Sequence, residues 1–122
     1  MEEDFIQNGL IAYIEGDIVQ SIDQFTKALN KNEKSYKALL CRGKSYINKG
    51  EIENALNDFN KAEELRTEQH LGDDLFYLKG KAFFEDENLE ESKKCLEKAI
   101  NENGVTEESK EKINKLLQRI ES

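Results

Sequence analysis

The chain has 122 residues, enough for one ordinary domain that buries about two thirds of its unfolded surface. Proline and tryptophan are absent, while Glu, Lys, Asn, Leu and Ile are frequent, which favours helices over sheets. The net charge of −8 argues against nonspecific binding to nucleic acid, because phosphate contacts need clustered Lys and Arg. We therefore expect one all-helical domain with no nucleic-acid partner.

The chain carries no recognisable membrane, metal or catalytic motif. No apolar run approaches the roughly 20 residues that span a bilayer, and the acidic start Met1-Glu2-Glu3-Asp4 is unlike a secretory signal. We expect a cytoplasmic protein without membrane insertion. Cys41 and Cys95 form no CxxC pair, and His70 is the only histidine, so they do not assemble a four-ligand zinc site. No nucleophile elbow or phosphate loop occurs, which predicts no enzymatic activity, no metal and no cofactor.

Internal repetition is the main signal along the chain. Residue types recur at a spacing of 34, which is typical of a helical repeat protein. A third copy follows the second at an interval three residues longer, as from Gly43 to Gly80 and from Ala62 to Ala99. The pairs at the 34-residue spacing are Gly9 and Gly43, Gly16 and Gly50, Phe25 and Phe59, Lys27 and Lys61, and Ala28 and Ala62.

Each copy contains two segments of helical periodicity joined by a short break. Gly50 lies where a left-handed helix end is favourable, and we expect Asn88 to replace glycine at the matching turn of the third copy. The three extra residues fall in the connector 69–74, which we expect to bulge outward. Thr106 is expected to cap the last helix. The predicted helices are 4–15, 18–30, 35–49, 52–65, 73–86, 89–101 and 106–121.

Glycines in the middle of predicted helices point to close packing. Gly9, Gly43 and Gly80 each cost their helix about 1 kcal/mol relative to alanine, so a compensating contact is expected. Close approach of a neighbouring helix would supply that contact. We expect the bulk beside these glycines to come from the second helix of each pair, namely from Phe25, Phe59 and Leu96.

The pattern resembles the tetratricopeptide repeat family over the first hundred residues. The second copy matches best, and it departs from the family by lacking the terminal proline and by having Leu39 in place of tryptophan. The resemblance implies an all-α, right-handed α-solenoid of about seven helices: three helix-turn-helix repeats over 2–35, 36–71 and 73–105, a capping helix over 106–121, and a single domain over 1–122. The residues of the second copy that carry the resemblance are Gly43, Tyr46, Gly50, Ala55, Phe59 and Ala62.

The resemblance also implies a binding surface, because the first helices of such repeats line a concave groove that receives peptides. On the first helix of each pair, a second stripe of residues at i, i+4 and i+7 lies beside the face that packs on the partner helix. Here the stripe is mostly apolar, which favours an adaptor or scaffold that binds a protein or peptide through apolar contacts, with lysines meeting an acidic residue. The predicted groove residues are Ile6, Leu10, Tyr13, Lys37, Leu40, Lys44, Ile47, Tyr77, Lys81 and Phe84.

The resemblance also admits other functions of the same fold. A well-known one is a carboxylate clamp that grips the acidic tail of heat-shock chaperones, but the matching positions do not hold the required cations and asparagines, so chaperone-tail binding is disfavoured. A constitutive structural subunit of a larger assembly, or self-association into a homo-oligomer, remain as alternatives. The five clamp positions hold Ile6, Leu10, Cys41, Asp74 and Leu78.

Overall fold

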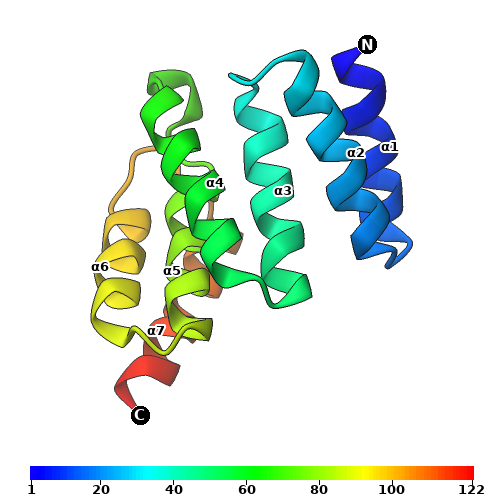
Figure 1. Cartoon of the computed structure of the whole chain (residues 1–122). Helices are drawn as coiled ribbons and strands as arrows, with labels where there is room; N and C mark the ends of the chain where they lie inside the picture. Colours follow the sequence, from blue (N-terminus) through cyan, green and yellow to red (C-terminus); the bar gives the residue numbers. More distant parts are fainter. The chain divides into compact units, whose positions relative to one another are not determined.

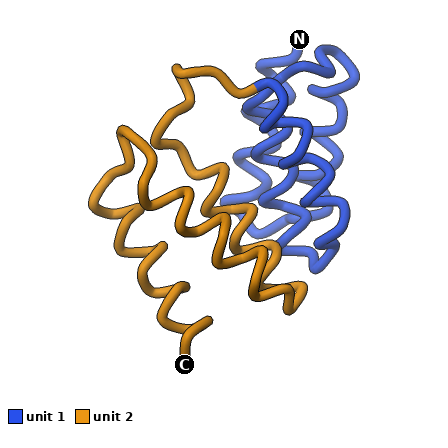
Figure 2. The backbone as a smooth tube through the Cα atoms, turned by 90° about the vertical axis from the view of Figure 1, so that its left-hand side faces the viewer, with its two compact units in different colours: residues 1–65 blue, residues 66–122 orange.

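A computed structural model describes all residues 1–122, and its regular secondary structure is entirely helical (Figure 1). The seven α-helices and the absence of strands confirm the predicted all-α fold. The chain divides into two compact units, residues 1–65 and 66–122 (Figure 2). The elements are α1 (Glu2–Ile14), α2 (Ile18–Lys31), α3 (Tyr36–Lys49), α4 (Ile52–Leu65), the 3-10 helix η1 (Glu68–His70), α5 (Leu75–Glu85), α6 (Leu89–Ile100) and α7 (Glu107–Glu121).

In the first unit the helices pack as the pairs α1 with α2 and α3 with α4, and α2 also packs against α3. A Cβ atom added to Gly9 would lie 2.5 Å from Cε1 of Phe25, and one added to Gly43 would lie 2.7 Å from Cζ of Phe59. Both rings are fully buried. The predicted close approach is therefore confirmed in both pairs, because only a residue without a side chain fits under the ring.

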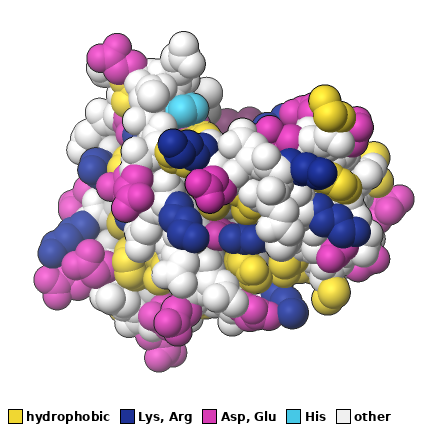
Figure 3. Space-filling view, turned by 45° about the horizontal axis from the view of Figure 1, so that its top comes forward, with side chains coloured by type: hydrophobic (Ala, Val, Ile, Leu, Met, Phe, Trp, Pro, Cys, Tyr) yellow, Lys and Arg dark blue, Asp and Glu magenta, His cyan; other side chains and the backbone are white.

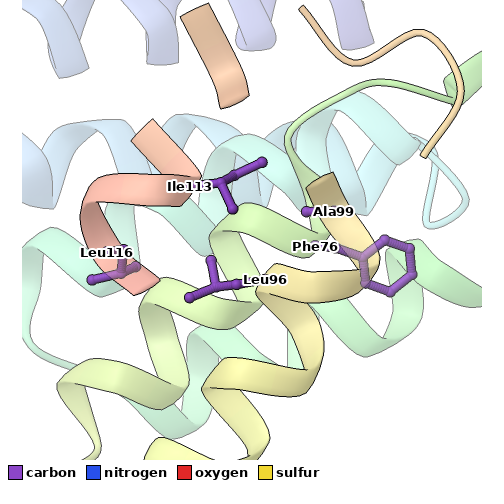
Figure 4. Packing of buried hydrophobic residues seen from close by; sticks show 5 residues of the cluster. All are labelled: Phe76, Leu96, Ala99, Ile113 and Leu116. Carbon is purple, nitrogen blue, oxygen red and sulfur yellow. The ribbon is translucent and has the colours of Figure 1, made fainter. Parts of the chain in front are cut away.

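The second unit repeats this arrangement with a smaller aliphatic residue. A Cβ atom on Gly80 of α5 would lie 2.8 Å from Cδ2 of Leu96, which is fully buried on α6. Helix α7 packs on α6 and α5 and adds two apolar side chains to the same core (Figure 4). The buried cluster consists of Phe76, Leu96, Ala99, Ile113 and Leu116.

Three buried serines stand where small residues are needed, and each hydroxyl has a partner. Ser21 of α2 donates to the Ser45 hydroxyl of α3 at 2.9 Å, which links two neighbouring pairs of the first unit. Ser92 of α6 donates to the backbone oxygen of Gly80 at 2.6 Å. All three are completely buried, so a hydrogen bond is required to offset the loss of water.

The turn within each helix pair contains one residue with a positive φ, and the sequence prediction of that residue is wrong for the third pair. Gly16 and Gly50 have φ values of 84° and 88°, as expected for left-handed helix ends. In the third pair this position is held by Glu87, with φ 62°, and the prediction that Asn88 takes it is wrong. Asn88 instead has φ −90° and caps α6, since its side-chain oxygen accepts from the Glu91 N–H at 3.3 Å. An N-cap asparagine contributes about 1 kcal/mol, which favours this register.

Helix α5 begins two residues later than the expected 73–86 because Asp73 has other partners. Its Oδ1 accepts from the Leu75 N–H at 3.0 Å and from Arg66 at 2.9 Å. The Arg66 guanidinium also forms an ion pair with Glu102 and donates to the His70 oxygen at 3.2 Å. The connector with the three extra residues is thereby held to the loop that follows α6.

Glu102 also holds the connector through a backbone hydrogen bond. It accepts from the Gly72 N–H at 2.7 Å, at a point where the backbones of Gly72 and Gly104 leave no room for a side chain. Burial acts to raise the pKa of Glu102, but the hydrogen bonds from Arg66 and from the Gly72 N–H outweigh it. The pKa therefore lies below its usual value of 4.5.

The glycine contact predicts that Gly43→Ala lowers the free energy of unfolding by about 1 to 3 kcal/mol, although alanine is the better helix former. The reason is that the new Cβ must displace the buried Phe59 ring. Urea unfolding measures the change, with the exposed α4 variant Asn57→Ala as the control, expected within about 0.5 kcal/mol of the parent. A Gly43→Ala chain as stable as the parent would refute the close approach.

Glu102→Gln is expected to lower the free energy of unfolding by about 2 to 4 kcal/mol at pH 7, because it leaves the nearly buried Arg66 without its main partner. A lowered folded-state pKa means that this stabilisation is complete above pH 4.5 and is lost as the pH falls through the folded-state value. The difference between parent and variant should thus shrink from pH 7 to pH 3 in urea unfolding. An unchanged difference, or an equal effect of Glu97→Gln on the exposed face of α6, would contradict this account.

Candidate partner-binding surface

In the first unit, four residues of the predicted stripe remain accessible on the first helices. Leu10 and Tyr13 of α1 are half-buried, as is Leu40 of α3, while Lys44 of α3 is exposed. Leu10, Tyr13, Lys44 and Cys41 line a hollow of about 20 Å³ over the Phe25 ring. That volume is close to what a single water needs, so the hollow can accept the tip of an apolar side chain and no larger molecule.

Tyr13 is held in place from two sides. The Asn48 amide on α3 donates to the Tyr13 hydroxyl at 2.7 Å, and Nζ of Lys44 lies 5.3 Å from the centre of the ring. Both contacts join α1 to α3, and they fix a ring that sequence alone placed only on a helix face. The role of Asn48 was missed, because a polar residue one position beyond the apolar stripe has no sequence signal.

Three other predicted residues of this unit have different surroundings. Ile6 and Ile47 are core residues, with 1% and 9% of their surface exposed, and so they have almost no surface to offer a partner. Lys37 is exposed, with Nζ 3.9 Å from the Glu3 carboxylate of α1. The stripe at i, i+4 and i+7 therefore turns partly into the helix interface, and its accessible part is Leu10, Tyr13, Leu40 and Lys44.

In the second unit, the predicted residues on α5 lie beside α7. Tyr77 and Phe84 are half-buried and pack against the core cluster that includes Ile113 and Leu116 of α7. Between them in sequence, Lys81 is half-buried on α5. Helix α7 therefore covers part of this stripe and leaves part of both rings accessible.

Two cations of α7 complete this surface. Nζ of Lys112 lies 5.6 Å from the centre of the Tyr77 ring, and Cζ of Arg119 lies 4.7 Å from the centre of the Phe84 ring. Sequence reasoning missed both residues, because the register of α7 on α5 is set by the burial of Ile113 and Leu116 rather than by any local pattern.

A larger hollow of about 490 Å³ opens elsewhere in the first unit. Arg42 at its wall is already bound, since it donates to Asp58 at 2.7 and 2.8 Å and to Thr26 at 3.2 Å. The hydrogen bonds that Arg42 donates to the Asp58 carboxylate raise the pKa of Arg42 above its usual value. The hollow is lined by Leu29, Asn30, Lys31, Glu33, Leu39, Arg42 and Lys61, a mixture of charges that does not define one ligand.

Metal-binding clusters, a reactive Cys41 thiol and membrane-spanning helices are not among the features of this structure. No group of three or more His, Cys, Asp or Glu side chains is placed to hold a metal ion. Burial raises the pKa of the Cys41 thiol, so it is protonated at neutral pH and a poor nucleophile. No helix combines the length and apolar character needed to cross a membrane. On the face drawn in Figure 3, acidic and basic side chains are interspersed.

Comparison with known proteins gives a consistent family and fold. The family model for the tetratricopeptide repeat matches residues 36–69 and 73–105. The first TPR of Spaghetti (RPAP3) bound to the HSP90 peptide SRMEEVD is a similar solved structure, at 21% identity and a TM-score of 0.82, covering 99% of this chain and 94% of that one. No curated protein matches this sequence.

Two further solved structures share the fold. The Sgt2 TPR domain from Aspergillus fumigatus is 22% identical with a TM-score of 0.83, covering 98% of this chain and 79% of that one. The Arabidopsis OM64 TPR domain is 16% identical with a TM-score of 0.81, covering 96% of this chain and 94% of that one.

The packing of α7 on the α5 stripe generates a prediction. Leu116→Ala should lower the free energy of unfolding of the second unit by about 2 to 5 kcal/mol, because it leaves a cavity in the core cluster. It should also raise the amide hydrogen-exchange rates of α7 more than those of α5. Gln118→Ala on the exposed face of α7 is the control. Unchanged exchange of α7 in the Leu116→Ala chain would show that the helix is held by other contacts.

Proposed function

This chain belongs to the tetratricopeptide repeat family, and from that premise we propose that it is a non-enzymatic adaptor module that binds an apolar peptide or helix of a partner protein. The proposed ligand surface is the accessible stripe of the first helices, which is described for each unit by itself. Leu10, Tyr13, Leu40 and Lys44 form this surface in the first unit, with Lys37 at its edge. Tyr77, Lys81 and Phe84 form it in the second.

One observation carries the proposal. Leu10 and Tyr13 stay half-exposed beside a hollow over the Phe25 ring. Leu10 and Tyr13 border the hollow from α1. On α3, Cys41 lines the hollow, and Leu40 directly precedes Cys41 in the sequence. A partner that inserts an apolar side chain there removes this surface from water, at roughly 25 cal/mol for each Å² buried.

Lysines at the edge of the apolar surface can orient the ligand on it. Lys44 is exposed next to Tyr13 and has no ion pair, and Lys81 likewise has none. A lysine beside an apolar surface can meet an acidic residue of the ligand and fix its orientation. The related Spaghetti domain was solved with an HSP90 peptide, which is a precedent for peptide binding by this fold.

A carboxylate clamp is still disfavoured at the positions that match it. Ile6 and Leu78 are buried, with 1% and 6% of their surface exposed, and neither carries a charge. The Asp74 carboxylate accepts from the Ser109 hydroxyl at 3.3 Å and would repel a second carboxylate. Peptide recognition by this chain therefore rests on apolar contacts rather than on a clamped terminal carboxylate.

Selection of a displayed library of random dodecapeptides on the immobilised chain tests the proposal. We expect enrichment of peptides with two or more large apolar residues, and loss of their binding, by at least about tenfold in Kd, in the Leu10→Asp/Leu40→Asp variant. The matched control is Asn8→Asp/Asn57→Asp, which adds the same charge at exposed helical positions of the same unit. Equal losses in both variants, with both still folded by circular dichroism, would sink the proposal.

A second candidate function has an observation of its own. Ile11, Ile14 and Val19 are 53%, 83% and 65% exposed near the turn between α1 and α2. Such apolar exposure suits a constitutive subunit of an assembly or a self-associating chain. Sedimentation velocity distinguishes the two uses: oligomers that dissociate on Ile14→Glu favour self-association, and a monomer at about 100 µM counts against it.

A further inference from the structure

The surface of the second unit carries a set of positive charges on two helices. Lys81 lies on α5 between Tyr77 and Phe84, and Lys112 and Arg119 of α7 lie over those two rings. Lys112 and Arg119 are seven residues apart, which is two helical turns, so they project from one side of α7. The two rings and three cations thus form one surface, which we call the α5/α7 surface.

These three cations have no carboxylate partner. On α7 the other two lysines are paired, Lys110 with Glu107 and Lys115 with Glu111, both at 3.3 Å. Glu108 and Glu85 stand four residues from Lys112 and Lys81, yet neither forms an ion pair with them. Other lysines of the chain also lack an ion pair, but Lys81, Lys112 and Arg119 are grouped around the half-buried rings of Tyr77 and Phe84.

The contact with a ring leaves a cation able to bind an acid. A guanidinium over an aromatic face interacts through its charge and its plane, so its N–H donors stay available for a carboxylate in bidentate geometry. An ammonium over a ring likewise keeps its hydrogens for acceptors. The ring also holds the cation in one place, which lowers the entropic cost of engaging a ligand.

From this arrangement we propose that the α5/α7 surface recognises a protein segment in which an apolar side chain is flanked by Asp or Glu, with α7 supplying the cations that select the flanking acids. The inference rests on the proposed function and specifies its partner. The apolar side chain contacts the accessible parts of Tyr77 and Phe84, and the acids meet Lys81, Lys112 and Arg119. Helix α7 therefore has a binding role in addition to covering the core.

The negative net charge of the chain means that a preference for acidic ligands is a discriminating test of this proposal. With a net charge of −8, long-range electrostatics favours basic ligands over acidic ones. A preference for acidic flanks can therefore arise only from local cations. We would measure fluorescence anisotropy with three labelled peptides that share a central Leu-Ser-Ser-Phe and carry four Glu, four Ser or four Lys on each side.

We expect the Glu-flanked peptide to bind at least about tenfold more tightly than the Ser-flanked one at about 50 mM salt, with the gap narrowing at about 500 mM as screening increases. Lys112→Glu/Arg119→Glu should abolish that gap. Lys34→Glu/Lys61→Glu, which makes the same change in net charge in the first unit, should preserve the gap. If charge reversal loosens α7, Lys112→Gln/Arg119→Gln gives the same comparison without new negative charge.

Each other outcome has a definite meaning. Equal binding of Glu-flanked and Ser-flanked peptides would overturn this inference and leave the proposed function standing. A gap reduced equally by both double variants would also overturn it, since net charge and not α7 would then be responsible. Binding by none of the three peptides would contradict the proposed function together with the inference.

Discussion

Each helix pair depends on the contact between a glycine of its first helix and a bulky side chain of its second. At Gly9 and Gly43 the partner is a fully buried phenylalanine, and at Gly80 it is Leu96. The contact fixes the rotation of the first helix about its own axis. It therefore also decides which side chains turn outward, and Leu10 and Tyr13 are accessible because Gly9 faces Phe25. The cost of a helical glycine, about 1 kcal/mol, is offset by burial of the facing side chain, about 1.5 to 3 kcal/mol.

Electrostatic links reinforce the glycine contacts and also reach elements that those contacts do not join. Arg42 of α3 binds Asp58 of α4 and Thr26 of α2, so it connects three helices of the first unit. Arg66 plays the corresponding part in the second unit, where it binds Asp73 and Glu102 and stacks with its Cζ 4.9 Å from the centre of the Phe76 ring. Such buried arginines act through several hydrogen bonds at once, which suits a fold built of separate helices.

The repeat period made the helices and their main contact predictable. Periodicity identified seven helices, and the recurrence of glycine opposite Phe25, Phe59 and Leu96 correctly indicated where the helices approach closely. The turn at Glu87 and Asn88 was misassigned, because both an N-cap and a left-handed residue are needed there and asparagine suits either.

The surface was less predictable, for physical reasons. Ile6 and Ile47 share the spacing of Leu10 and Leu40, but their exposure depends on how far neighbouring helices reach over them, which a spacing does not encode. The Arg66 to Glu102 link joins residues 36 positions apart, and charged residues are too common in this chain for such a pair to stand out. Lys112 and Arg119 acquire their place only once α7 has docked on the core cluster.

The central claim is that the outward stripes of the first helices are the ligand surface. Backbone amide chemical-shift mapping by NMR, with the chain titrated by its tightest selected peptide, tests this claim most directly. The account predicts that the largest shifts fall on α1 and α3 near Leu10, Tyr13 and Lys44, or on α5 and α7 near Tyr77 and Phe84. Shifts confined to α2, α4 and α6 would contradict it, because the ligand would then occupy the opposite faces of the helix pairs.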